Sequence, residues 1–168
     1  QALALLKADF SFRFVHVGGG EILANLHALA AKLDLAGMID WKGALTHGEV
    51  LELYRQADVF ALACRVTDDG DRDGLPNVLV EACSQGLVCV STAISGVPEL
   101  LSDGENGRLV EPENPAALAV ALSELMRDPS LRQRLGAAAE RRVRQHFDYH
   151  TSVNQLDALF RSGWRSET

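Results

Sequence analysis

Short apolar runs alternate with amphipathic stretches along the first part of the chain. The runs that predict β-strands cover residues 12–17, 38–43, 59–64 and 87–91. Between them, apolar residues recur at three- and four-residue spacings over residues 21–33, which predicts a helix there. Capping residues and a proline at the helix start predict two further helices, over residues 47–56 and 76–84. The run at 59–64 has no charged position, which is typical of a central parallel strand that is covered on both faces.

Helix-capping residues refine these boundaries. Thr46, with Glu49 three residues later, predicts a capping box before the second helix. After residue 113 the whole pattern is helical. Asn114 stands before a proline and predicts a helix start, and Ser130 is expected to cap the next helix. A last helix is expected over residues 150–160.

Strands that alternate with helices predict the α/β class. The expected architecture is a doubly wound, Rossmann-like parallel sheet with additional C-terminal helices, in a single domain over residues 1–168. Such folds bind ligands at the carboxyl ends of their strands. Three segments are expected there: the glycines after Val17, the acidic loop after Cys64, and the stretch 91–96.

Composition narrows the function classes. The 168 residues include 16 Lys and Arg against 23 Asp and Glu, a net charge of -7 that argues against general binding to nucleic acid or to a membrane surface. The three cysteines have no zinc-type spacing and predict reduced core residues of a cytoplasmic protein. No signal peptide, membrane span or metal-ligand motif is found. Because the first residue is Gln1, we expect a fragment.

The segment 73–81, "DGLPNVLVE", has the chemistry of a phosphate site. Gly74 allows a ligand to approach the backbone closely, and the proline at position 76 suits the first turn of a helix. The first-turn amides of Asn77, Val78 and Leu79 are expected to have no partner within the helix. Together with the helix dipole, such amides favour a phosphate.

Two acids flank this helix start. Glu81 lies four residues after Asn77 on the same face, where its carboxylate can accept hydrogen bonds from vicinal hydroxyls such as those of ribose. Asp73, in the loop, is placed to hold another hydroxylated group. The spacing alone fits equally well a polar loop followed by an acid that faces solvent.

A calcium loop is the competing interpretation of the same acidic segment. Asp69, Asp71, Asp73 and Gly74 match the opening of an EF-hand loop. The bidentate acid of such a loop would fall at position 80, which is Val80. We therefore expect no metal site here.

The glycine cluster after the first strand has two interpretations. Gly18, Gly19 and Gly20 resemble part of a dinucleotide-binding loop, but Leu23 occupies the place of the third glycine of that motif. The cluster then forms either a tight strand-to-helix turn or a surface along which a substrate passes closely.

Two longer segments carry a resemblance to a known family. "DGLPNVLVEACSQGLVCVST" and "SGVPELLSDGENGRLVEPENPAALAVAL" resemble the C-terminal half of GT-B glycosyltransferases, and are most similar to the large retaining family 4 with nucleotide-sugar donors. Two acids seven residues apart, an Ala-rich helix, a Gly-x-Pro-Glu turn and an Asp-Gly-x-Asn-Gly turn follow in order. The similarity extends over nearly the whole chain.

The resemblance implies roles for individual residues. Glu81 would hold the ribose of the donor nucleotide, and Asp73 would contact the donor sugar. Other donor contacts would come from Lys42 and Gly43 near the base, from Gly18, Gly19 and Gly20 beside the cleft, and from the backbone of Gly74, Leu75, Pro76, Asn77, Val78 and Leu79. The implied reaction retains the anomeric configuration, transfers a hexosyl-type group, and needs no metal or other cofactor.

The chain departs from the family pattern in two respects. The first acid is usually Glu, and Asp73 is one methylene shorter. The Arg and Lys that clamp the pyrophosphate, and the N-terminal domain that binds a carbohydrate or lipid acceptor, are expected outside this chain. We therefore expect the fragment alone to be inactive, and peripheral membrane association is open for the full enzyme. The alternatives are a nucleotide-sugar epimerase of the same fold and a non-catalytic binding module.

Overall fold

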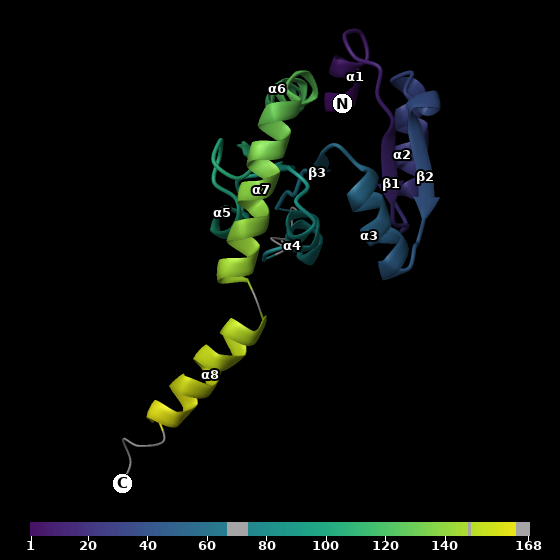
Figure 1. The fold of residues 1–168 in the computed structure, drawn as a ribbon. Coiled ribbons are helices and arrows are strands. Elements are labelled where there is room, and N and C mark those ends of the chain that lie inside the picture. Colours follow the sequence, from purple (N-terminus) through teal and green to yellow (C-terminus); the bar gives the residue numbers. More distant parts are fainter. Residues whose placement is uncertain (67–73, 148, 164–168) are drawn as a thin grey trace.

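The computed structural model describes residues 1–66, 74–147 and 149–163. All pairings between its strands are parallel, and helices connect successive strands (Figure 1). The predicted α/β class and the doubly wound, Rossmann-like arrangement are therefore confirmed.

The first part of the chain contains α1 (Ala2–Leu6), β1 (Phe14–Val17), α2 (Leu23–Lys32), a short 3₁₀ helix (Ala36–Met38), β2 (Ile39–Gly43) and α3 (His47–Gln56). The middle contains β3 (Phe60–Leu62), α4 (Asn77–Ser84), β4 (Cys89–Thr92), α5 (Val97–Leu100) and β5 (Arg108–Val110). The last part contains α6 (Pro115–Arg127), α7 (Pro129–His146) and α8 (Tyr149–Gly163). The sequence pattern predicts β1 to β4 and the longer helices, whereas α1 and β5 have no predicted counterpart.

The caps show where local chemistry sets the helix ends. The capping box at α3 is confirmed, because the Glu49 amide donates to the Thr46 hydroxyl and the Thr46 amide donates to the Glu49 carboxylate. Asn114 caps α6 as expected. The prediction of Ser130 as a cap is wrong. Asp128 caps α7 instead, because its carboxylate accepts the amide three residues later and a proline follows it at the first helical position.

Two sheets carry the fold. β1 pairs with β2, and a separate sheet has the order β3-β4-β5. β4 is fully buried between two layers of helices: α4, α5 and α7 cover one face, and α1 and α6 cover the other. β3 lies at the edge of its sheet and is half-buried. The expectation of a central strand with both faces covered is therefore met by β4 and is wrong for β3.

The helix α7 packs very closely against the end of α4. Gly86 adopts a φ of +72° after α4, and the amide of Leu87 donates back to the Ala82 carbonyl, which closes the helix end. A Cβ atom at Gly136 of α7 would stand 2.1 Å from the Gly86 carbonyl oxygen. The absence of a side chain at Gly136 therefore sets the distance between the two elements.

Two cysteines belong to this core. Cys83 and Cys89 are fully buried, with their sulfur atoms 3.5 Å apart as thiols. The hydrogen bond from Cys83, followed by burial, raises the pKa of the Cys89 thiol well above its ordinary value. The expectation of reduced core cysteines is confirmed for this pair, whereas Cys64 is half-buried.

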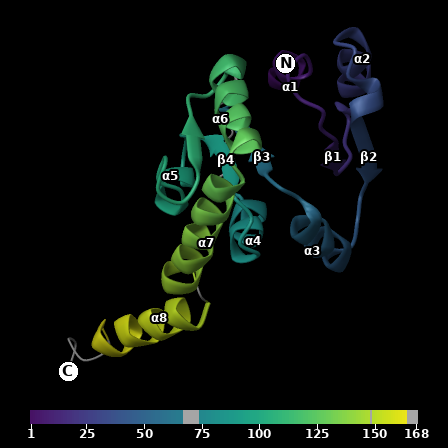
Figure 2. The ribbon, with the colours of Figure 1, turned by 45° about the horizontal axis from the view of Figure 1, so that its top comes forward.

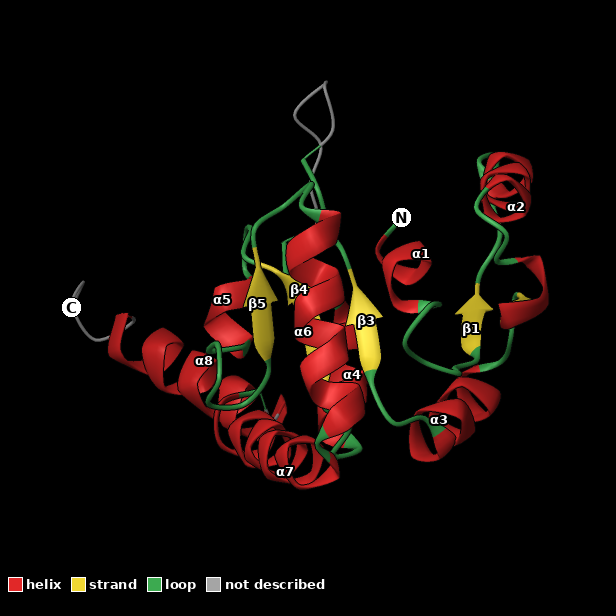
Figure 3. Cartoon of the chain, turned by 90° about the horizontal axis from the view of Figure 1, so that it is seen from above, coloured by secondary structure: helices red, strands yellow, loops and turns green. Residues whose placement is uncertain are grey.

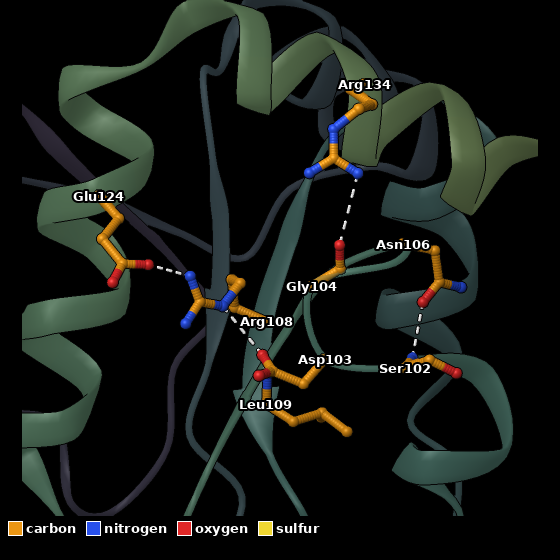
Figure 4. Close-up of polar contacts among 8 residues, drawn as sticks. All are labelled: Ser102, Asp103, Gly104, Asn106, Arg108, Leu109, Glu124 and Arg134. Atoms are coloured by element: carbon orange, nitrogen blue, oxygen red, sulfur yellow. Dashed lines mark hydrogen bonds and ion pairs between the residues drawn. The ribbon is translucent and has the colours of Figure 1, made fainter.

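A network of polar contacts fixes the turn before β5 (Figure 4). The buried Asn106 accepts the Ser102 amide at 2.6 Å and donates to the last carbonyl of α5 at 2.9 Å. Arg108 donates to Asp103 at 2.9 Å and also pairs with Glu124 of α6. Because this turn precedes its strand, it lies at the edge of the sheet opposite the carboxyl ends.

The last helix is set apart from the remaining helices. Figure 2 shows α8 leading away from α7, and its apolar side chains Val153, Leu156, Leu159 and Phe160 are exposed. Trp164 lies outside the described residues. Across the described ranges, no helix has the length and apolar character to cross a membrane.

Candidate functional site

The predicted site residues follow the carboxyl ends of the strands. β1, β3 and β5 point the same way in Figure 3, so the segments that follow them emerge at one edge. The glycines 18–20 follow β1, Gly43 ends β2, and residues 74–79 lie between β3 and the body of α4. Asp73, together with Asp69 and Asp71 of the competing calcium interpretation, lies outside the described residues.

The start of α4 presents two backbone amides. Pro76 is the N-cap residue rather than the first helical residue, and the helix begins at Asn77. The Leu79 amide donates to the Pro76 carbonyl at 3.0 Å, so the expectation of an unpartnered amide is wrong for Leu79. The amides of Asn77 and Val78 have no acceptor among the described residues, and both residues are exposed. Their N–H groups and the helix dipole favour an anion at this point.

Glu81 lies one turn further along α4. It is half-buried, and its carboxylate has neither a hydrogen bond nor an ion pair with any described residue. Tyr54 of α3 lies nearby and donates its hydroxyl to the Val78 carbonyl at 3.5 Å. Burial, followed by the negative charge of Glu81, raises the pKa of Tyr54 to about 12. Glu81 therefore offers acceptor oxygens that no hydrogen bond or ion pair with another described side chain uses.

The loop that enters α4 rests on the loop that follows β4. The Gly96 amide donates to the Gly74 carbonyl at 2.9 Å. A Cβ atom at Gly96 would lie 3.2 Å both from that oxygen and from the Cβ of Leu75. The hydroxyl of Thr92 also donates to the Cys64 carbonyl at 2.7 Å, just after β3. These contacts place Gly74 and Leu75 at the carboxyl edge of the sheet.

The two glycine segments of the first sheet meet each other. The Gly18 amide donates to the Gly43 carbonyl at 2.8 Å. Gly18 and Gly20 have φ values of +123° and +137°, so the turn itself favours glycine there. A Cβ atom at Gly18, Gly19 or Gly20 would have no heavy atom within 4 Å. Packing within the protein therefore does not require the cluster, and the turn conformation accounts for two of its three members.

Lys42 is held by an acid on its own strand. Its ammonium group lies 3.0 Å from the Asp40 carboxylate, which Arg13 also contacts. The hydrogen bonds from Lys42 and then Arg13 lower the pKa of Asp40. To reach a ligand, Lys42 has to exchange this partner. None of the hydrogen bonds between described residues joins this group to residues 74–79.

This arrangement suits a phosphorylated, hydroxylated ligand. The two amides of α4 can donate hydrogen bonds to phosphate oxygens, and the Glu81 carboxylate can accept hydrogen bonds from hydroxyls one turn away. Within the described ranges, no three His, Cys, Asp or Glu side chains gather as a metal site. Sequence reasoning found the amides and the acid from their spacing. It missed Tyr54 and the contact at Gly96, for which no local pattern exists.

Residues 1–142 match the family model described as glycosyl transferases group 1. The chain belongs to this family. It is 36% identical over 165 residues to WcaL of Salmonella typhimurium, a candidate colanic acid biosynthesis glycosyltransferase. The alignment covers 96% of this chain and 40% of that protein. It is 30% identical over 144 residues to a GDP-mannose-dependent phosphatidylinositol monomannoside mannosyltransferase of Mycolicibacterium smegmatis. This alignment covers 85% of this chain and 38% of the relative. The chain thus spans about two-fifths of the length of these glycosyltransferase relatives.

Solved structures agree on the fold. The chain is similar to HepE of Anabaena in complex with UDP-glucose, with a TM-score of 0.82 and 23% identity over 96% of this chain and 44% of that one. It is also similar to the C-terminal domain of the group 1 protein LpcC of Francisella tularensis, with a TM-score of 0.74 and 23% identity. That match covers 88% of this chain and 76% of the LpcC domain. The fold is that of the C-terminal domain of GT-B glycosyltransferases.

Proposed function

We propose that the chain is the donor-binding domain of a retaining glycosyltransferase of the family 4 type. One observation carries the proposal. Among the described residues, the amides of Asn77 and Val78 at the start of α4 and the carboxylate of Glu81, one turn later, have no partner, and this helix follows β3 at the carboxyl side of the sheet. A nucleotide-sugar carries a diphosphate beside a ribose. The two amides can bind the negatively charged diphosphate, and the Glu81 carboxylate can bind the ribose hydroxyls.

Each residue has a defined task in this proposal. The amides of Asn77 and Val78 bind the diphosphate, and Glu81 accepts the ribose hydroxyls. Asp73 contacts the hydroxyls of a hexosyl group, with the backbone of residues 74–76 beside it. Lys42 and Gly43 lie near the base, and the glycines 18–20 border the donor.

The catalytic logic is electrostatic. When the bond from the sugar to the diphosphate breaks, negative charge develops on the leaving phosphate oxygens. Fixed amide dipoles aimed at that charge lower the barrier without needing to reorganise. The chain carries a net charge of -7, so further cations have to come from elsewhere in the protein. No metal has a task in this scheme.

The named relatives support a nucleotide-sugar donor. HepE was solved with UDP-glucose, and the mycobacterial relative is named as dependent on GDP-mannose. In our proposal another domain binds a carbohydrate or lipid acceptor, because these relatives are much longer than this chain. The whole enzyme acts in the cytoplasm, and the 168-residue chain alone does not transfer sugar.

Donor turnover by the full-length protein tests the proposal. UDP-glucose and GDP-mannose are each supplied with a panel of lipid and oligosaccharide acceptors, and the anomeric configuration of the product is read by NMR. We expect transfer from one of the donors with retained configuration, and none by the 168-residue chain. Inverted product, epimerised donor without transfer, or binding of neither nucleotide would contradict it.

A further inference from the structure

Two thiols meet in the core beneath the last turn of α4. Cys83 lies in that turn, Cys89 is the first residue of β4, and both residues are fully buried. The Cys83 thiol donates to the Cys89 sulfur, and the two sulfur atoms are 3.5 Å apart. Neither residue has a task in the proposed binding of a donor. The pair is therefore a chemically reactive feature that the proposed function leaves unused.

The distance between the two sulfur atoms is short enough for a disulfide to form. An S–S bond is about 2.05 Å long, so the sulfur atoms have to approach each other by about 1.5 Å. Rotation of the two side chains about their Cα–Cβ bonds can supply a movement of this size. The backbone between them already forms a closed turn. The Gly86 amide donates to the Cys83 carbonyl at 3.0 Å, and the Leu87 amide donates to the Ala82 carbonyl at 3.2 Å.

The surroundings of the pair favour a reaction between these two thiols. The core cluster that contains them is otherwise apolar near α4 and α5, with Leu79, Val97, Leu100 and Leu101. The third cysteine, Cys64, lies at the other end of β4, because its carbonyl accepts the hydroxyl of Thr92. Thr92 stands three residues after Cys89 on the strand, which separates the two by roughly 10 Å. An oxidised sulfur in the pair therefore has the other member as its thiol neighbour.

The end of α4 controls access to the pair. Residues 84–86, which cover this end, are half-buried. The Ser84 hydroxyl donates to the Glu81 carbonyl at 2.7 Å, and Arg55 of α3 donates to the Gln85 side chain at 3.3 Å. Local opening with a low free energy is typical of fraying element ends, whereas core segments open only with global unfolding. Opening of this turn is the route by which a small oxidant reaches the sulfur atoms.

We infer that Cys83 and Cys89 form a redox-sensitive modification site, at which an oxidant of the peroxide class converts the two thiols into a disulfide. The thiol pair is the resting form, and the disulfide is the form made under oxidation. Disulfides in cytosolic proteins are usually transient and catalytic or redox-sensing, which fits a pair that rests as thiols. The inference rests on the contact between the two sulfur atoms, so it does not depend on donor binding.

The reaction proceeds in two steps. Cys83 reacts first, because it lies in the turn that opens, whereas the raised pKa of Cys89 keeps that thiol protonated. The Cys83 thiolate attacks one peroxide oxygen, the O–O bond breaks, and the departing hydroxide takes up a proton and leaves as water. The Cys89 sulfur then attacks the sulfenic sulfur, the S–O bond breaks, and the hydroxyl leaves with the Cys89 proton as a second water. The two sulfur atoms lose the two electrons that the peroxide gains.

Peptide mapping after treatment with hydrogen peroxide tests the site. Trypsin cleavage after Arg72 and Arg108 leaves both thiols on one peptide, 73–108, whereas Cys64 lies on the separate peptide 56–65. The folded full-length protein is treated with peroxide beside free glutathione as a control for the oxidant, then unfolded, alkylated and digested. We expect most of peptide 73–108 to be lighter by two hydrogen atoms and to resist alkylation until dithiothreitol restores both thiols. Cys64→Ser should give the same result.

Three results would overturn the inference. Two alkylated thiols on peptide 73–108, after the glutathione has been oxidised, would show that the pair only fills the core. Sulfinic or sulfonic acid on that peptide without the loss of two hydrogen atoms would show that the sulfur atoms do not join. A bond between peptides 73–108 and 56–65 would assign the disulfide to Cys64. The wild type itself carries the result, so a poorly folding variant does not affect it. Because no nucleotide is present, failure here is separate from failure of the proposed function.

Discussion

The Gly96 amide donates to the Gly74 carbonyl at 2.9 Å and so ties the loop after β4 to the loop after β3. Neither loop belongs to a regular element at this point, and this bond fixes one against the other. Gly74 leads directly into the helix start whose amides form the candidate phosphate site. The position of that site therefore depends on a residue 22 positions further along the chain than Gly74.

Substitution of Gly96 by alanine should affect the donor more than the fold. The new methyl group would lie 3.2 Å from the Gly74 oxygen and from Leu75, so the loop has to shift by a few tenths of an ångström. We expect a loss of stability of about 1 kcal/mol. Nucleotide-sugar affinity of the full-length protein, measured by calorimetry, should fall clearly. An unchanged affinity would show that this contact does not position the site.

Substitution of Gly136 by alanine tests the packing of α7. The added Cβ would stand 2.1 Å from the Gly86 carbonyl oxygen, which belongs to the backbone and cannot rotate away. Despite the better helix propensity of alanine, we expect a loss of about 1–3 kcal/mol in urea unfolding. Gly48→Ala in α3 is the matched control, because its Cβ meets no atom within 4 Å. Equal stability of the two variants would refute the close approach.

Substitution of Asn106 by alanine removes two buried hydrogen bonds at the far edge of the sheet. The Ser102 amide and the last carbonyl of α5 lose their partner inside the protein. We expect the free energy of unfolding to fall by about 1–3 kcal/mol. Glu105→Ala, at the exposed neighbouring position of the same turn, should change it little. Nucleotide affinity of the folded protein should stay the same, since this turn lies away from the carboxyl ends.

Tyr54 should make stability depend on alkaline pH. Burial and then the charge of Glu81 raise its pKa from 10.0 to about 12 in the folded protein. The folded state thus keeps the proton more tightly, and the stabilisation is complete below about pH 10 and is lost as the pH rises toward about 12. Urea unfolding at about pH 9 and about pH 11 should show a steeper loss for the wild type than for Tyr54→Phe. If the wild type and Tyr54→Phe lose the same unfolding free energy between these two pH values, the Tyr54 hydroxyl does not have a raised pKa in the folded protein.

Local patterns predicted much of this molecule. Thr46 and Glu49 define a helix start within four residues, and the acid and the amides of α4 follow from the spacing of Glu81 and Asn77. The contact between Gly96 and the loop after β3 joins distant segments, so no local spacing indicates it. Ser130 failed as a cap because Asp128 competes with it two residues earlier. Likewise, the apolar run of β3 does not indicate which strands lie beside it, and the expected central position is wrong.

The affinity of the full-length protein for its nucleotide-sugar, with and without the Glu81 carboxylate, tests the central claim most directly. Calorimetry with UDP-glucose and GDP-mannose compares the wild type with Glu81→Ala, and Glu105→Ala at the opposite edge of the sheet serves as the control. We predict that Glu81→Ala weakens binding of the preferred donor by about 1–3 kcal/mol through lost ribose contacts, while the control binds like the wild type. Equal affinity of Glu81→Ala and the wild type would contradict the account.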